Sequence, residues 1–280
     1  MLVGILEQGL IYAPMALGLY ISFKVLKIID LTIDGSFTLG AAITTVLILN
    51  GVNPILCLLI SGIIGGLAGL ITGIIHIKFN VRDLLAGIIM MMALYSINLR
   101  IVGSSNKPLI GNATIFSNSF VADNKIILIF LIVLALKIIL DIYLKTKSGY
   151  LLKATGENEN LVTTLGKNSG NLTILGLAIS NALVALSGSI LCQQQNFFDI
   201  SMGAGAMIAA FATVVIGIEL FKGIKFIKPT TFTILGSIVY RAAVAFALYI
   251  GFRATDLRLL TAIIFLIVLV LSEKGRYLKK

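Results

Sequence analysis

The chain has 280 residues, of which 58% are hydrophobic and only 12% are charged, and its formal net charge is +10. In a typical soluble domain about a quarter of the residues are charged. This chain has a lower charged fraction, and apolar runs of about 20 residues recur along it. These properties exclude an ordinary soluble domain and predict an all-α polytopic membrane protein, since a membrane β-barrel would show short segments of alternating polarity. The positive charge does not indicate nucleic-acid binding, because basic residues in cytoplasmic loops explain it.

Nine apolar segments are predicted to cross the membrane, within an architecture of about 8 to 10 transmembrane helices. Lysine and arginine concentrate in alternate connections between these segments and at the C-terminal end, EKGRYLKK. Because cytoplasmic loops carry such an excess, the C-terminus is predicted to lie inside the cell and the N-terminus outside. In chain order, the predicted crossings are 3–23, 36–49, 55–77, 84–101, 125–144, 171–192, 203–221, 231–251 and 259–272.

Residues 24–40, KVLKIIDLTIDGSFTLG, are the most informative polar break of the chain, with Asp30 and Asp34 four positions apart. An ionisable group near the hydrocarbon region costs roughly 2.5 to 3.5 kcal/mol at mid-membrane, so it usually faces the bundle interior or a water-filled path. The stretch therefore predicts one short or re-entrant polar helix break near 28–36. The alternative is a local role, in which Asp34 and Ser36 cap the next helix.

Two connections between the predicted crossings are unusually long. The cytoplasmic segment 145–170 is predicted to hold a short surface helix, with Thr155 as its N-cap and Gly166 at its end. The apolar stripe of this helix needs a cover, which either the membrane boundary or another protein could provide. This apolar stripe consists of Leu161, Val162 and Leu165.

The outer loop 102–124 is equally compatible with a functional loop and with a solvated linker.

Two spacings within predicted helices indicate packing. Lys137 and Asp141 are four residues apart, so their opposite charges can pair on one helix face and lower the cost of placing them in the membrane. A helix face of small residues lets another backbone approach closely, either within the subunit or at a contact between subunits. Such a face is formed by Gly65, Gly69 and Gly73.

Motifs for several kinds of chemistry are absent from the sequence. There is no GxxxxGK[ST] loop for nucleotide hydrolysis, no HExxH or GxSxG motif, and no cysteine–histidine set with metal-ligand spacing. Asp30 and Asp34 could in principle form an aspartic pair, but nothing marks one as the acid and the other as the base. The chain is therefore expected to be neither an enzyme nor a metal protein, and no cofactor is expected.

The first hundred residues contain a specific motif, GLIYAPMALGLYISFKVLKIIDLTIDGSFTLGAA. This stretch resembles the opening of permeases of the branched-chain amino acid class of ABC importers. It is most similar to a subgroup with a DLTxDGSFTLGAA motif, which includes tryptophan- and tyrosine-type uptake systems. The resemblance covers nearly the whole chain. Further blocks that resemble the same subgroup lie at Leu84–Ile88, Met92–Ile101, Gly156–Gly166 and Ile179–Gly203.

The resemblance implies how the chain is organised and what it binds. A single transmembrane permease domain would span 1–280, and 145–170 would be a cytoplasmic coupling-helix loop that docks on an ABC ATPase subunit. The outer loop 102–124 would help to receive an extracytoplasmic solute-binding protein. A second copy of the chain would complete a homodimer in the lipid bilayer of a prokaryotic cytoplasmic membrane. The residues implied in ATPase coupling are Ala154, Gly156, Glu157, Asn158, Leu161 and Gly166.

We therefore predict the membrane-spanning permease subunit of an ATP-binding-cassette importer for a small, amino acid-like organic solute, with aromatic amino acids among the candidates. ATP hydrolysis would occur on a separate partner chain. Candidate residues of the solute path are polar residues in otherwise apolar surroundings, although each could instead be a local cap or turn. These candidates are Asp30, Thr32, Asp34, Ser36, Asn98, Gln193, Gln194 and Asp199.

Two other functions are compatible with the sequence. An ion-coupled secondary transporter would use Asp30 or Asp34 to bind H⁺ or Na⁺, and it would transport without an ATPase. A subunit of an ABC exporter for lipids or envelope components would instead respond to lipid rather than to a loaded binding protein.

Overall fold

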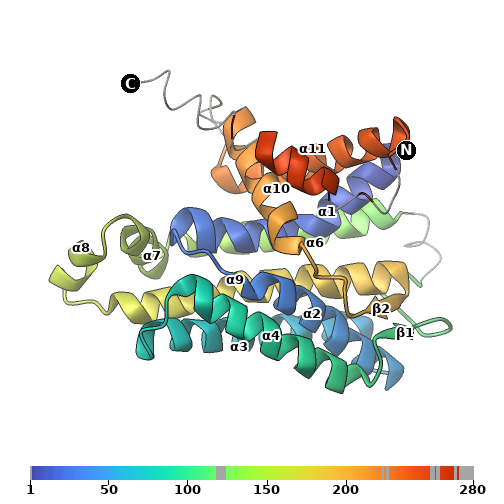
Figure 1. Ribbon diagram of the computed structural model, residues 1–280, viewed down its shortest axis with the longest axis horizontal. Coiled ribbons are helices and arrows are strands. Elements are labelled where there is room, and N and C mark those ends of the chain that lie inside the picture. The colour runs from blue at the N-terminus through green and yellow to red at the C-terminus, as the bar shows by residue number, and fades with distance from the viewer. Residues whose placement is uncertain are drawn as a thin grey trace.

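The computed structural model describes residues 2–117, 124–221, 224, 227–252, 256, 259–267 and 270. In these residues the protein is a bundle of helices with one pair of short strands (Figure 1). Seven helices in the described part of the chain are long and apolar enough to cross a membrane, which confirms the predicted all-α polytopic architecture. The elements are α1 (Leu2–Leu19), η1 (Tyr20–Val25), α2 (Thr32–Leu49), α3 (Pro54–Lys78), α4 (Asp83–Val102), β1 (Asn106–Pro108), α6 (Lys125–Tyr143), α7 (Lys147–Glu157), α8 (Glu159–Thr164), α9 (Ser169–Gln195), β2 (Phe197–Asp199), α10 (Ala206–Phe221) and α11 (Pro229–Tyr249).

Each predicted crossing corresponds to a helix, although several ends differ by a few residues. The crossing predicted at 203–221 is α10, which is shorter than the seven long helices. Of the crossing predicted at 259–272, residues 259–267 and 270 are helical, and the others lie outside the described residues.

The polar break between the first two crossings is shorter than predicted and begins earlier. Non-helical backbone covers 26–31, and Thr32 already begins α2, so the predicted break at 28–36 extends too far. The reason is a side-chain turn: the Asp30 carboxylate accepts a hydrogen bond from the Thr32 N–H at 2.9 Å. An aspartate whose carboxylate accepts a hydrogen bond from the backbone N–H two residues later can begin either a turn or a helix. Asp34 therefore lies in the first turn of α2 and does not precede it.

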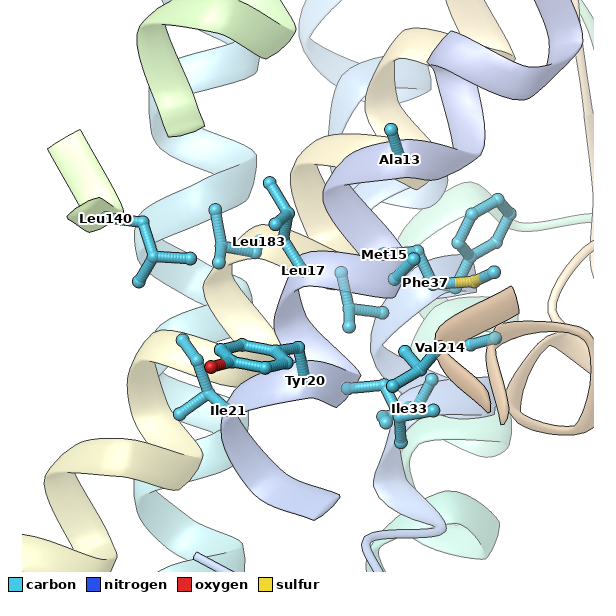
Figure 2. Packing of buried hydrophobic residues seen from close by; sticks show 14 of the residues in the cluster. Ala13, Met15, Leu17, Tyr20, Ile21, Ile33, Phe37, Leu140, Leu183 and Val214 are labelled. Carbon is cyan, nitrogen blue, oxygen red and sulfur yellow. The ribbon is translucent and has the colours of Figure 1, made fainter. Parts of the chain in front are cut away.

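Helices α1 and α9 form the centre of the bundle and lie antiparallel. The Ser180 hydroxyl donates to the Gly18 carbonyl at 2.8 Å, and the Ser187 hydroxyl donates to the Ile11 carbonyl at 2.6 Å. Later residues of α9 thus meet earlier residues of α1. Figure 2 shows the apolar side chains around this pair, including Leu17, Leu140 and Leu183 from α1, α6 and α9. These side chains form the core on which the other helices pack.

The glycine face predicted in the third crossing packs within the subunit. A Cβ at Gly65 would lie 2.8 Å from the Asn181 carbonyl oxygen, one at Gly69 would lie 2.8 Å from the Asn181 Cβ, and one at Gly73 would lie 2.8 Å from the Ile174 Cα. All three glycines therefore face α9 at close range. Of the two readings of this face, the structure confirms a contact inside the subunit.

Two parts of the described chain, which we call its two halves, share an order of elements. In the first half, α1 leads through a polar turn to α2 and α3, and in the second half α9 leads through a polar turn to α10 and α11. The turns share a local bond, because Asp199 accepts from the Ser201 N–H at 2.7 Å just as Asp30 accepts from Thr32. Since α1 and α9 are antiparallel, the halves run in opposite directions. Such inverted repeats are typical of membrane transporters.

The two ends of the bundle carry different features. Helices α7 and α8 lie together at one end, hereafter the α7–α8 end (Figure 1). Strands β1 and β2 pair antiparallel at the other end, with Asn106 opposite Asp199, and this end is hereafter the β1–β2 end.

Asp141 on α6 is the centre of a buried ionic cluster that joins α6 to the start of α11. Its side chain is only 8% exposed and accepts from Lys137 at 2.9 Å, from Lys228 at 2.8 Å and from the Thr230 hydroxyl at 2.7 Å. The predicted Lys137–Asp141 pair is therefore confirmed, and Lys228 and Thr230 are additional partners that the helix spacing alone could not reveal.

Replacing Asp141 with asparagine should lower the stability of the protein by about 3 kcal/mol, because two lysines would lose their shared partly buried counter-charge. A lower midpoint of thermal unfolding in detergent, followed by size-exclusion chromatography, would measure this loss. Lys145→Gln is the matched control, since Lys145 is exposed in the turn just after α6. Equal midpoints for Asp141→Asn and Lys145→Gln would show that the cluster contributes little.

Candidate functional site

Asp30 and Thr32 form a sealed polar cluster between three elements. Asp30 is 1% exposed, and its carboxylate accepts from the Asn181 amide of α9 at 2.7 Å. The hydroxyls of Thr32 and Thr72 lie 3.0 Å apart and join α2 to α3. Neither Asp30 nor Thr32 lines the two cavities described below. In this conformation both residues hold helices together.

Asp34 caps a helix from the other half of the chain. One carboxylate oxygen accepts from the Gly205 N–H at 3.0 Å, and the other accepts from the Met207 N–H at 2.7 Å. These N–H groups lie at the start of α10, where a helix has donors without partners and a positive dipole end. The Thr38 hydroxyl supports the same junction by accepting from the Gly203 N–H at 3.1 Å. The start of α10 is thus fixed on α2.

A cavity of about 370 Å³, which we call the α2–α4 cavity, lies on one side of this junction. Asp34 and Asn98 both line it, together with Tyr95 and the methionines Met91 and Met92. The Asn98 amide donates to the Gly35 carbonyl at 3.2 Å, whereas its buried oxygen has no hydrogen-bond partner among the described residues. Two of the predicted path residues are therefore brought together at one cavity.

A second cavity of about 370 Å³, which we call the α10–α11 cavity, shares Ala204 and Gly205 with the first. Tyr12 of α1 lines it, as do Tyr240 and Arg241 of α11. Sequence analysis did not include Arg241 among the path residues. The signal was present, because an arginine within an apolar membrane helix is costly and usually functional.

The other predicted path residues lie away from these cavities. Ser36 is buried, and within the part of the chain that the structure describes its hydroxyl has no hydrogen-bond partner. Gln193 accepts from the Ile115 N–H at 3.0 Å, and Gln194 donates to Glu7 at 3.0 Å. These glutamines and Asp199 connect segments near the β1–β2 end. The path role of all eight candidates stays a prediction.

The predicted surface helix at 145–170 is two helices, α7 and α8. Asn158 separates them, since its side chain accepts from the Leu161 N–H at 3.2 Å and caps α8. The prediction that Thr155 caps the start of a helix is wrong. Helix α7 continues to Glu157, and the Thr155 hydroxyl donates to the Leu151 carbonyl within α7.

The apolar stripe of α8 is only partly covered. Val162 is fully buried, whereas Leu161 and Leu165 are 53% and 61% exposed. Gly166 follows α8 with a φ of 69°, a left-handed conformation that glycine adopts readily. The α7–α8 end therefore presents two exposed leucines in a polar segment.

Helix α7 contacts the end of the first crossing without intervening side chains. A Cβ at Gly156 would lie 2.8 Å from the Val25 carbonyl carbon and 2.9 Å from the Leu26 Cα. Leu26 begins the short segment that leads to Asp30. A displacement of α7 would therefore act directly on the backbone next to the buried polar cluster.

Comparison with known proteins agrees with this architecture. A protein-family model for the branched-chain amino acid transport system / permease component matches residues 1–273. The chain is 44% identical over 279 residues to the tyrosine transport system permease protein of Clostridioides difficile (strain R20291), which covers 100% of this chain and 94% of that protein. It is also 35% identical over 270 residues to an uncharacterized protein of Rickettsia prowazekii (strain Madrid E), covering 95% of each.

Among solved structures, PsaBC from Streptococcus pneumoniae in complex with Fab contains a similar chain. The TM-score is 0.53 at 16% identity, with 99% of this chain and 92% of that chain covered, so the likeness concerns the fold alone. The family match and the two sequence relatives confirm the resemblance found in the sequence. This multi-pass protein of the prokaryotic cytoplasmic membrane therefore belongs to the branched-chain amino acid transport system / permease component family.

Proposed function

We propose that the chain is the membrane-spanning permease subunit of an ATP-binding-cassette importer for an amino acid-like solute such as tyrosine. The observation that carries this proposal is the match over the whole chain to a permease family, with a tyrosine transport system permease protein at 44% identity. The inverted halves support the proposal, since transporters use such repeats to switch access between the two sides of the membrane.

Uptake into proteoliposomes tests this function. Vesicles that contain the permease and its ATPase should accumulate tyrosine only when ATP and a tyrosine-loaded binding protein are supplied. Accumulation by the permease without the ATPase would overturn the proposal in favour of an ion-coupled carrier.

The proposed site of ATPase docking is the α7–α8 end, within the coupling loop 145–170. Leu161 and Leu165 present apolar surface next to exposed Glu157, and such a surface needs a partner to cover it. The close contact between Gly156 and Val25 would transmit movement of the docked helices to the membrane core. The full set of proposed coupling residues is Ala154, Gly156, Glu157, Asn158, Leu161 and Gly166.

Replacing both Leu161 and Leu165 with serine should abolish co-purification of the co-expressed ATPase while leaving the permease in the membrane. The expected reason is loss of the apolar contact, worth about 1.5 to 3 kcal/mol for each leucine that the partner would bury completely. Ile110→Ser is the control, because Ile110 is 84% exposed at the β1–β2 end. Retention of the ATPase by the double variant would move the docking site elsewhere.

The remaining partners are proposed from the same resemblance. The loop 102–124, of which residues 118–123 lie outside the described residues, would receive the solute-binding protein at the β1–β2 end. Two copies of the chain would form the complete permease in the bilayer. Chemical cross-linking of the purified importer would test both contacts.

A further inference from the structure

Arg241 is a charged side chain in the interior of α11, and no carboxylate among the described residues forms an ion pair with it. Its Nε atom is buried and has no hydrogen-bond partner in that part of the chain. The contrast with Lys137 is informative, because that membrane lysine is paired with Asp141. The protein therefore neutralises Lys137 with a carboxylate, whereas Arg241 has no such counter-charge among the described residues. An unpaired charge within a membrane helix is costly.

Aromatic rings hold the Arg241 guanidinium in place. Its central carbon lies 3.7 Å from the centroid of the Tyr12 ring and 5.9 Å from that of Tyr240. Tyr12 in turn stacks on Phe37, with ring centroids 5.6 Å apart and an angle of 17° between the planes. Stacking occupies the planar face of a guanidinium, whereas its N–H donors point outward in the plane and can bind another partner. The arginine is thus oriented in advance for a planar acceptor.

The α10–α11 cavity provides the space for such an acceptor. Its volume of about 370 Å³ is within the range of small-molecule sites. Among the described residues, its lining contains Arg241, two tyrosines and Thr261 but no aspartate or glutamate. Asp34, the carboxylate that caps α10, already accepts two backbone N–H groups and lines the α2–α4 cavity. A small anion would therefore meet a fixed cation without a competing carboxylate.

We infer that the α10–α11 cavity is a subsite for the carboxylate group of the transported solute, with Arg241 as its bidentate partner. The inference rests on the proposed import of an amino acid-like solute and names the group of the solute that the permease recognises. The planar fork of an arginine matches a carboxylate with two parallel hydrogen bonds. Tyr12 acts as a positioning residue, and the wall of Ala206, Ile208 and Ala209 offers apolar surface to the rest of the solute.

Protection from phenylglyoxal, which modifies guanidinium groups, tests this subsite on the purified importer in nanodiscs. Tyrosine should slow modification of Arg241 by about tenfold, as read by peptide mass spectrometry, whereas tyrosinamide at the same concentration should not. Arg100, which is exposed on α4, is the internal reference and should react equally in both cases. Equal protection by both compounds, or no protection, would overturn the inference.

Two further outcomes of this experiment are decisive. Protection by nanodiscs of anionic lipid, without any effect of tyrosine, would assign the arginine to a lipid headgroup. Failure of the reagent to modify Arg241 in solute-free protein would show that the cavity is closed to small molecules. Both results contradict the subsite.

Variants separate the subsite from the proposed function. In proteoliposomes, Arg241→Met should lower solute uptake about tenfold, while ATP hydrolysis stimulated by the loaded binding protein is retained. Uptake by Arg241→Lys should lie between that of Arg241→Met and that of the wild type. Wild-type uptake by Arg241→Met would overturn the subsite. Absence of ATP-driven uptake in the wild-type importer would overturn the proposed function alone, because the protection experiment requires neither ATP nor transport.

Discussion

Replacing Gly188 with leucine should prevent the chain from accumulating as a folded membrane protein. A Cβ at this position would overlap the Phe37 carbonyl oxygen and lie 2.8 Å from the carbonyl carbon. Backbone atoms cannot turn aside as a flexible side chain can, so α2 and α9 would have to separate. Overpacking a core costs about 1 to 3 kcal/mol, occasionally more, and here the displaced unit is a whole helix at the centre of the bundle. Size-exclusion profiles of detergent-solubilised protein would measure the loss of the folded peak.

Gly4→Leu is the matched control for Gly188→Leu. Gly4 also lies within an apolar helix, but a Cβ added there would meet no atom within 4 Å. The control should therefore give a normal profile. A folded Gly188→Leu variant with an unchanged melting temperature would show that α2 and α9 do not meet at Phe37.

The helices of this fold were predictable because the bilayer fixes their length and polarity. A crossing requires about 20 apolar residues, so runs such as 55–77 and 171–192 stand out without any knowledge of their neighbours. Helix ends were less predictable, because a single side chain can move them. Asp30 started α2 earlier than the apolar pattern indicated, and Asn158 split the segment 145–170 into two helices where Thr155 was expected to begin one.

The candidate site was less predictable than the fold, since its contacts join residues far apart in the sequence. Asp34 was recognised as an unusual membrane carboxylate, but its partners lie more than 170 residues away, at Gly205 and Met207. The inverted halves explain this distance, because each half supplies one side of the junction. In the sequence, the repeat is visible only as an aspartate followed two residues later by a hydroxyl residue. This pair is Asp30 and Thr32 in one half and Asp199 and Ser201 in the other.

Replacing Asp34 with asparagine should reduce solute uptake by about tenfold and lower stability by about 1 to 2 kcal/mol, the usual cost of losing a helix cap. The carboxylate uses one oxygen for the Gly205 N–H and the other for the Met207 N–H. Asparagine keeps the shape but has only one acceptor oxygen, so its amide would turn N–H groups toward an N–H donor of α10. It also removes the negative charge that favours the positive end of the helix dipole. Transport assays and thermal unfolding of the same purified protein would measure both effects.

The ratio of the two effects distinguishes a cap from a solute contact. If Asp34 only fixes α10, Thr38→Val should lose uptake and stability in the same proportion, because the Thr38 hydroxyl accepts the Gly203 N–H at the same junction. If Asp34 also contacts solute in the α2–α4 cavity, Asp34→Asn should lose more uptake than its stability loss accounts for. Asp83→Asn is the control, since Asp83 is partly exposed at the start of α4 and does not line the α2–α4 cavity. Its carboxylate accepts from the Leu84 N–H at 2.8 Å and from the Ile29 N–H at 3.3 Å. Wild-type uptake by Asp34→Asn would contradict both roles and leave the α10 junction without a function in transport.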